Sequence, residues 1–279
     1  MTLQSKSAET RFPARSANQP RPSMLPQSVS TVIPPAVFFV VVIGLWQLAS
    51  AIGLLGQFVA PAPSSIAHDL GGMLGQGFFW SSVETTLVET VAGFAIGVLA
   101  GLVFGMLTAI FPIFRRSVYP HALAFQIIPR SALAPLFLLW LGFGLSSKIA
   151  MAASMSFFPL VVSTVAGIQA VDRDSQLLMR SLGASRWQMF YHLILPSAAP
   201  LVAAGAKLAL TLALIGSVIA EFIGGSVGLG VLLTQFQQNL DVPRVYAVIV
   251  VLAILGLLLY AILVFAERKI IFWTNKSAL

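Results

Sequence analysis

The sequence predicts an all-α, polytopic membrane protein with six transmembrane helices. Three observations support this prediction: 58% of the 279 residues are hydrophobic, only 9% are charged, and the uncharged apolar runs are long enough to cross a bilayer. A soluble domain carries about 25% charged residues. The composition therefore cannot cover a water-facing surface, and it excludes a soluble globular enzyme.

Six apolar runs define the expected spans. They are residues 32–52, 84–111, 118–141, 148–169, 196–222 and 244–266. The third run contains Pro129, Arg130 and Pro135, so we expect a kinked or broken helix there. The spans form one membrane domain, residues 32–270. A basic, proline- and serine-rich tail (1–31) precedes it, and a short tail (271–279) follows it.

The distribution of lysine and arginine predicts the orientation of these spans. If the basic tail is cytoplasmic, twelve of the 16 cationic residues share its side: Lys6, Arg11, Arg15, Arg21, Arg115, Arg116, Arg173, Arg180, Arg186, Arg268, Lys269 and Lys276. Lys148 and Arg244 are expected at the opposite face. By the positive-inside rule, both termini are cytoplasmic, with outer loops at 53–83, 142–144 and 223–243. The Arg- and Ser-rich tail leaves an organelle transit peptide open as an alternative.

Several kinds of site are not expected in this chain. It has no cysteine, which excludes disulfides and thiolate metal sites, and His68, His121 and His192 are scattered. We therefore predict no metal site and no catalytic residues. The net charge of +7 reflects cytoplasmic loops of a membrane protein rather than nucleic-acid binding. No lysine follows the glycine pattern of a phosphate-binding loop, so we do not expect this chain to hydrolyse ATP itself.

Four glycines in the second span recur at a strict four-residue interval and share one helix face. Small residues at this spacing let two membrane helices approach closely. The sequence leaves two partners open: another helix of the same chain, or a second copy. The helix-packing residues are Gly93, Gly97, Gly101 and Gly105.

The loop between the fourth and fifth spans, residues 170–196, has apolar residues at helical spacing. It predicts two short amphipathic helices joined at Gly183. Asp172 or Asp174 can cap the first helix, Gly183 can end it in a left-handed conformation, and Pro196 can open the next span. Such a hairpin suits either the lipid surface or a protein partner.

This loop resembles the EAA loop of permease subunits of ATP-binding-cassette (ABC) importers. That pattern is Glu-Ala-Ala, three residues, Gly, nine residues and I-x-L-P, and the spacing matches from Gly183 through Leu193–Pro196. Leu177, Leu178 and Met179 replace Glu-Ala-Ala, and Asp174 is the nearest acidic substitute. The resemblance assigns docking of an ATPase to Leu178, Met179, Arg180, Ser181, Leu182, Gly183, Ala184, Ser185, Arg186, Trp187, Leu195 and Pro196.

Other segments resemble the sulfonate, taurine and nitrate permeases of that family: 60–64, 128–144, 181–187, and Ala220-Glu221 followed by Gly228-Leu229-Gly230. The resemblance implies a type I ABC importer permease fold, a non-enzymatic transport subunit and a bacterial inner membrane. Its implied partners are a second copy, membrane lipid, two cytoplasmic ABC ATPase subunits that bind ATP and Mg, and a periplasmic or lipid-anchored substrate-binding protein. The implied cargo is a small anionic solute; pyrimidine, flavin and aromatic-acid compounds are alternatives within the family.

Charged residues within spans are costly and mark candidate pathway positions. The candidates are Arg130, Lys207, Glu89 and Glu221. Arg130 and Lys207 share a similar depth, so two copies could place four cations around an anion pathway. In the alternative interpretation Lys207 extends to the interface and Arg130 satisfies carbonyls freed by Pro129 and Pro135. Glu84 and Glu221 are expected to reach the interface.

Three functions outside this family remain as alternatives. A gradient-driven secondary transporter would show a charge relay and repeat symmetry in its spans, and we see no convincing repeat. An intramembrane enzyme would need a convergent nucleophile, base or metal set, which the sequence does not display. A passive channel would conduct without nucleotide.

Overall fold

The computed structural model describes residues 27–56 and 58–273. Every regular element among them is a helix, which confirms the predicted all-α class. The elements are α1 (Gln27–Ala51), α2 (Pro63–Leu74), α3 (Gly77–Ile110), α4 (Pro112–Ser117), α5 (Tyr119–Ile127), η1 (Arg130–Leu133), α6 (Ala134–Leu141), α7 (Leu145–Gln169), α8 (Arg173–Ser181), α9 (Arg186–Met189), η2 (Phe190–Ile194), α10 (Leu195–Gly224), α11 (Leu229–Gln238) and α12 (Val242–Ile270). Most of the predicted basic tail and residues 274–279 of the predicted C-terminal tail lie outside the described residues.

The chain divides into two compact units, Met1–Leu48 and Ala49–Leu279. The first contains most of α1, whose apolar side chains from Val37 to Val42 are exposed. This helix coincides with the first predicted span. The second unit contains all other helices.

Four helical segments are long and apolar enough to cross a membrane: Gly77–Ile110, Leu145–Gln169, Arg186–Gly224 and Val242–Ile270. Shorter apolar helices, Val37–Ala51 and Arg130–Leu141, coincide with the first and third predicted spans. The third is broken, as expected: α5 ends at Ile127, Pro129 precedes a 3₁₀ turn, and Pro135 lies in the first turn of α6. The four long segments coincide with the remaining predicted spans, 84–111, 148–169, 196–222 and 244–266.

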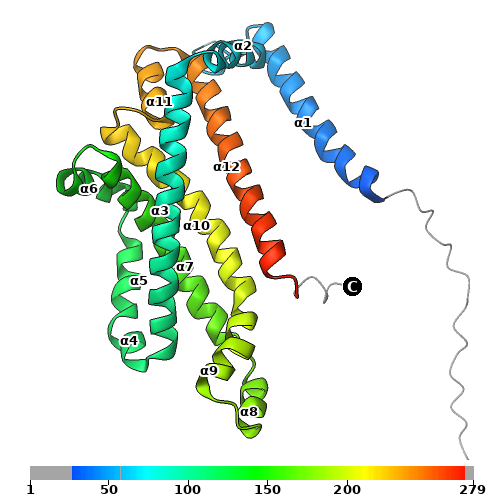
Figure 1. The fold of residues 1–279 in the computed structure, drawn as a ribbon. Helices are drawn as coiled ribbons and strands as arrows, with labels where there is room; N and C mark the ends of the chain where they lie inside the picture. Colours follow the sequence, from blue (N-terminus) through cyan, green and yellow to red (C-terminus); the bar gives the residue numbers. More distant parts are fainter. Residues whose placement is uncertain (1–26, 57, 274–279) are drawn as a thin grey trace, which may run out of the picture. The chain divides into compact units, whose positions relative to one another are not determined.

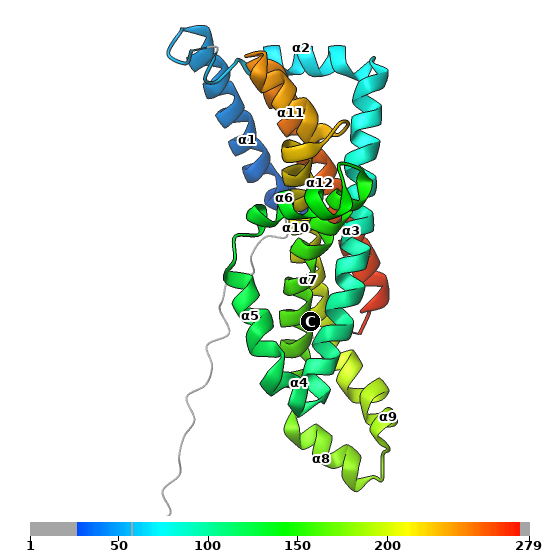
Figure 2. The same ribbon diagram turned by 90° about the vertical axis from the view of Figure 1, so that its left-hand side faces the viewer.

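Each of the two long connections predicted as outer loops, 53–83 and 223–243, contains a helix. α2 crosses the upper ends of α3 and α12 in Figure 2 and buries Ile66 and Met73. α11 follows Gly228, whose φ is +144°, and buries Leu229 and Phe236. α3 also begins at Gly77 rather than at residue 84, because the apolar run 77–83 extends the helix beyond the exposed Glu84.

The core consists of α3, α7 and α10, which run side by side (Figure 1). A Cβ placed on Gly101 would lie 2.7 Å from Leu160 Cβ, and one on Gly105 would lie 2.6 Å from Thr164 Cβ. Gly93 and Gly97 face Ala152 and Ser156 in the same way. The residues of α7 that face these glycines, at positions 152, 156, 160 and 164, are also four residues apart. The glycine face packs against a helix of its own chain.

Two core helices contain internal prolines, Pro159 in α7 and Pro200 in α10. A proline lacks the N–H that would bond to the carbonyl four residues earlier. The carbonyl freed by Pro159 is that of Met155, and Arg130 Nη1 donates to it at 2.9 Å. The carbonyl freed by Pro200 is that of Pro196, and Trp273 Nε1 donates to it at 3.3 Å. Each freed carbonyl therefore has a side-chain donor from a distant part of the chain.

Candidate functional site

The loop 170–196 begins with a capped helix at the lower end of Figure 1. Asp172 is the N-cap of α8: Ser175 donates to Asp172 Oδ2 from its N–H (2.8 Å) and from its hydroxyl (2.7 Å). These hydrogen bonds, the hydroxyl's first, lower the pKa of the Asp172 carboxyl. Of the two predicted caps, Asp172 makes the bond.

α8 ends in a Schellman motif around Gly183. Gly183 N–H donates to Arg180 O and Ala184 N–H donates to Met179 O, both at 3.0 Å, while Gly183 has a φ of +77°. A left-handed end at this glycine is what the sequence predicts. Ser185 then caps α9 through a reciprocal pair of hydrogen bonds with Gln188.

The predicted second short helix is wrong in one respect, because it does not end before the next span. The helix runs without a break from Arg186 to Gly224. Pro196 has no N–H, which leaves the His192 carbonyl without an α-helical donor. A π-helical turn, Phe190–Ile194, lies at this point and carries the helix into α10. α8 and α9 form one hairpin, residues 172–189, attached to α10 (Figure 2).

The apolar face of this hairpin is uncovered. Leu178 is 61% exposed, Leu182 74% and Trp187 71%, and α8 buries no side chain. Tyr191 stacks on Trp187 with ring centroids 6.1 Å apart. Among the other predicted docking residues, Arg180, Ser181, Gly183, Ser185, Arg186 and Leu195 are exposed, and Met179, Ala184 and Pro196 are half-buried. The hairpin thus offers apolar side chains flanked by arginines.

At the opposite end of the core, three ionisable residues are buried together. Glu89 is 0% exposed, Glu221 1% and Lys148 3%. With the hydroxyls of Thr86, Thr90 and Ser217 they form what we call the buried polar cluster. Thr86 donates to Glu221 Oε1 at 2.6 Å, and Thr90 and Ser217 share a hydrogen bond of 2.9 Å. The cluster links α3 to α10.

One prediction about these residues is wrong. Glu221 does not reach the interface, because the turn 225–230 and α11 fold over it and Gly230 N–H donates to its carboxylate. The Lys148 ammonium turns inward and donates to the carbonyls of Phe143 (2.9 Å) and Gly144 (3.2 Å).

Sequence reasoning missed Lys148 and Thr86, although a signal for Thr86 exists. Thr86, Glu89, Thr90 and Gly93 lie at positions i, i+3, i+4 and i+7 of one helix. They extend the glycine face, so they are expected at the same helix contact. All four are buried.

The two cations of the predicted anion pathway each have a partner. Lys207 Nζ lies 2.6 Å from Glu267 Oε2, within an ion pair that links α10 to α12. Arg130 donates to Met155 O and lies over the Phe158 ring, 5.0 Å from its centroid. The predicted acceptors of Arg130 were carbonyls freed by Pro129 and Pro135; the observed acceptor is freed by Pro159.

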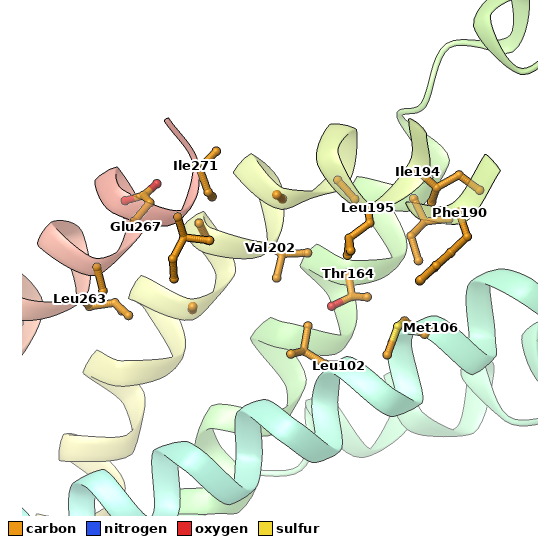
Figure 3. Close-up of a pocket in the computed structure, with 17 residues that line it drawn as sticks. Leu102, Met106, Thr164, Phe190, Ile194, Leu195, Val202, Leu263, Glu267 and Ile271 are labelled. Atoms are coloured by element: carbon orange, nitrogen blue, oxygen red, sulfur yellow. The ribbon is translucent and has the colours of Figure 1, made fainter. Parts of the chain in front are cut away.

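A cavity of about 390 Å³ lies between α3, α7, α10 and α12 near the hairpin (Figure 3). Its walls are apolar apart from Thr164 and Glu267. Glu267 is paired with Lys207, and none of the described residues bonds to the Thr164 hydroxyl. These walls lack the converging polar groups that would orient a polar solute.

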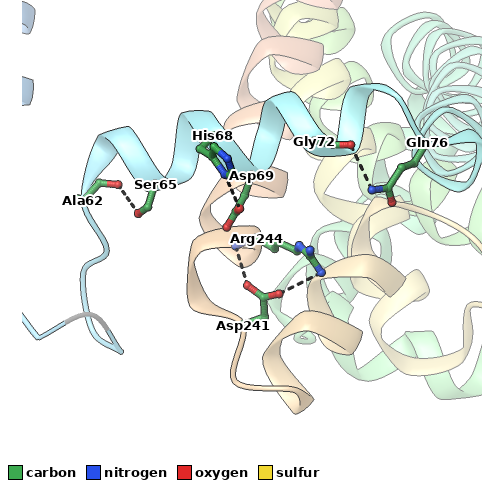
Figure 4. Close-up of polar contacts among 8 residues, drawn as sticks. All are labelled: Ala62, Ser65, His68, Asp69, Gly72, Gln76, Asp241 and Arg244. Carbon is green, nitrogen blue, oxygen red and sulfur yellow. Dashed lines mark hydrogen bonds and ion pairs between the residues drawn. The ribbon is translucent and has the colours of Figure 1, made fainter.

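The polar contacts drawn in Figure 4, at the α2 end, are local. Asp241 caps α12 by accepting from Arg244 N–H at 3.3 Å, and its other oxygen lies 3.3 Å from Arg244 Nη1. On α2, His68 Nδ1 and Asp69 Oδ1 are 3.3 Å apart. Each of these contacts joins residues close in sequence and stabilises helix ends. One further hydrogen bond, from the Tyr246 hydroxyl to Val59 O at 3.0 Å, links α12 to the segment before α2.

Comparison with known proteins identifies relatives along most of the chain. The family described as "Binding-protein-dependent transport system inner membrane component" matches residues 97–272. The chain is 32% identical to the formylaminopyrimidine transport permease protein ThiX of Halalkalibacterium halodurans, covering 87% of this chain and 96% of that protein. It is 31% identical to the riboflavin transport system permease protein RibX of Chloroflexus aurantiacus, covering 82% and 85% of the respective chains.

A third relative and a solved structure agree with this result. The putative aliphatic sulfonates transport permease protein SsuC of Bacillus subtilis is 30% identical, with 85% of this chain and 86% of that protein covered. An inward-facing structure of the MetNI methionine ABC transporter contains a chain of the same fold. It matches with a TM-score of 0.55 and 22% identity, over 71% of this chain and 94% of that one.

Proposed function

Because the chain belongs to the family of binding-protein-dependent transport system inner membrane components, we propose that two copies of this ABC transporter permease form one translocation pathway. Two cytoplasmic ATPase subunits, which bind ATP and Mg, drive it, and an external substrate-binding protein supplies it. The observation that carries this proposal is the uncovered apolar face of the α8–α9 hairpin.

Apolar exposure is ordinary on a helix that faces lipid, but the hairpin has a different composition. It carries Asp172, Arg173, Asp174, Arg180 and Arg186 within 15 residues, which is typical of an aqueous boundary. Leu178, Leu182 and Trp187 are uncovered in that setting. Exposed tryptophan beside arginine matches the composition of protein interfaces. A rigid hairpin continuous with α10 can transmit closure of a bound ATPase into the core.

Co-purification tests the assembly. We expect the chain, isolated from its native membrane in mild detergent, to carry an ABC ATPase and a binding protein, with two permease copies by native mass spectrometry. Gly183→Val forces a β-branched residue into a left-handed conformation that costs roughly 1–2 kcal/mol. It should abolish co-purification of the ATPase and leave the membrane core folded. Gly72→Val, in α2 with open space around it, is the control. Retention of the ATPase by Gly183→Val would contradict the docking role.

The absence of cysteine gives a direct test of orientation. We infer that the hairpin and both termini are cytoplasmic. Single cysteines can replace two exposed serines, Ser181 in the hairpin and Ser226 at the opposite end. In intact cells, an impermeant maleimide should label Ser226→Cys and spare Ser181→Cys; in inverted vesicles the labelling should reverse. The opposite pattern would overturn the orientation.

For the cargo, we infer a small solute with an anionic group, of the sulfonate, taurine or nitrate type. Relatedness to a sulfonate permease supports this inference. Relatedness to formylaminopyrimidine and riboflavin permeases favours a second candidate, a neutral heteroaromatic compound. Mass spectrometry of the ligand retained by the co-purified binding protein separates the two. A heteroaromatic ligand without an acidic group would overturn the first candidate.

A further inference from the structure

Glu89 differs from every other charged residue that the structure describes. Its side chain is completely buried, and none of the described residues donates a hydrogen bond to either carboxyl oxygen. Ionised carboxyl groups in protein interiors are ordinarily paired, hydrogen-bonded or bound to a cation, because burial removes the water that stabilises their charge. Glu89 in this conformation therefore requires a ligand that neutralises it.

Of the two carboxyls, Glu221 is the one whose surroundings stabilise a negative charge. Its carboxylate accepts hydrogen bonds from the Thr86 hydroxyl and from Gly230 N–H. Gly230 lies in the first turn of α11, where the helix dipole favours a negative charge. Thr86 in turn accepts from Leu229 N–H at 2.9 Å. Thr86 and Glu221 therefore accept the hydrogen bonds of the first two backbone N–H groups of α11.

Glu89 lies beside this carboxylate. Its neighbour on α3, Thr90, bonds to Ser217 on α10, and Thr86, one turn away, bonds to Glu221. Glu89 thus lies on the stretch of α3 that carries both links to α10, and Glu221 and Lys148 are near enough to act on its charge. α7 contributes Lys148 and α10 contributes Glu221; α11 has no titratable side chain. With one cation and two carboxyls, one positive charge is missing.

We propose that Glu89 is a proton-binding site and that its bound proton keeps α11 seated on α3 and α10. A proton fits because it needs no coordination sphere, whereas a metal ion would need several oxygen ligands, and most oxygens of this cluster are already engaged: Glu221 accepts from Thr86 and Gly230, and Thr90 bonds to Ser217. Loss of the proton would place a second negative charge beside Glu221. The turn 225–230 packs directly on the Glu221 carboxyl, since a Cβ on Gly228 would collide with it. Deprotonation would therefore loosen the attachment of α11.

Infrared spectroscopy of the purified full chain in detergent tests for the proton. A protonated carboxylic acid has a C=O stretching band separate from the bands of carboxylates. We expect wild type at neutral pH to show such a band, Glu89→Gln to lose it, and Glu84→Gln, an exposed position on the same helix, to retain it. Persistence of the band in Glu89→Gln, or its absence from wild type at neutral pH, would overturn the proposal. The second criterion needs no variant.

Thermal unfolding and amide exchange test the link to α11. The folded state would bind a proton that the unfolded chain releases, so the unfolding temperature of wild type should fall as pH rises. Glu89→Gln, which mimics the protonated acid, should remove this part of the pH dependence. The amides of Leu229 and Gly230 should exchange faster in wild type than in Glu89→Gln at high pH. Stabilisation by Na⁺ or K⁺ at constant pH and ionic strength, lost in Glu89→Gln, would show a metal ion instead and overturn the proposal. These readouts require neither ATPase nor substrate, so they succeed or fail independently of the transport function.

Discussion

At the scale of single residues, prolines explain side chains that otherwise resemble functional ones. Arg130 is a cation within an apolar segment, and such residues ordinarily mark substrate pathways. Its guanidinium donates to Met155 O, the carbonyl that Pro159 deprives of its helical donor. Trp273 has the same relation to Pro196 O and Pro200. A structural role and a transport role for Arg130 are therefore separable by mutation.

We expect Arg130→Met to destabilise the protein by about 1–3 kcal/mol, because it leaves a buried carbonyl unsatisfied. Pro159→Ala restores an N–H for that carbonyl, so the double variant should recover much of the loss. Thermal unfolding in detergent measures both effects. Additive losses in the double variant would show that Arg130 does not act through the freed carbonyl. If stability recovers but anion uptake does not, the guanidinium also serves the cargo.

The Asp172 cap should show a pH dependence confined to acid. The folded pKa of Asp172 lies below its ordinary value of 3.8. Its contribution to stability is therefore fully present above that value and is lost as pH falls through the lowered folded pKa. Asp172→Ala should raise amide exchange across α8 at neutral pH, while Asp172→Asn, an equally good cap, should retain protection at neutral pH and in acid. Asp174→Ala is the control, since Asp172 makes the cap. Equal amide exchange in the two alanine variants would show that the Asp172 cap does not stabilise the hairpin.

At the scale of elements, sequence patterns located the helices better than their ends. The glycine interval in α3 predicted a close contact, and the left-handed residue that ends α8 was predicted at Gly183. The predicted helix ends were wrong where a charged residue was taken to mark the membrane interface. Glu84 lies well inside α3, and Glu221 is covered by α11. A single sequence shows that a residue is charged, but the partner that makes its burial tolerable comes from a distant helix.

A glycine at the contact between α3 and α7 and a glycine in open space should respond differently to substitution by alanine. A Cβ on Gly97 would collide with Ser156 and lie 2.6 Å from the Ala153 carbonyl. Gly97→Ala should therefore cost about 1–3 kcal/mol through overpacking. Gly72→Ala, in open space on α2, should be neutral or stabilising by up to about 1 kcal/mol, because alanine favours helix. Thermal unfolding and expression level provide the comparison, and equal stability of the two variants would mean that the helices separate freely at Gly97.

At the scale of the whole molecule, the proposed translocation pathway depends on more than one chain. The family and the fold follow from the sequence, because hydropathy, the hairpin spacing and the broken third span are local patterns. The pathway is different. Arg130 and Lys207 come from separate helices, and a ring of cations would need two copies. The ion pair between Lys207 and Glu267 also could not be read from the sequence, because 60 residues separate them in the chain.

This ion pair gives the sharpest test of the cation pathway. Lys207 Nζ lies 2.6 Å from Glu267 Oε2, and both side chains are about one-quarter exposed. If Lys207 serves to pair with Glu267, the charge exchange Lys207→Glu/Glu267→Lys should retain folding and uptake, while Lys207→Glu alone places two carboxylates together and should lose both. If an anionic cargo needs the cation at position 207, the exchanged variant should fold and hydrolyse ATP but transport poorly. Uptake into vesicles that contain the complete transporter, at matched expression, separates the outcomes. Because Glu267 already neutralises the charge of Lys207, we expect the exchanged variant to retain at least half of wild-type uptake. A tenfold loss of uptake with normal stability would show that the cargo needs the cation at position 207.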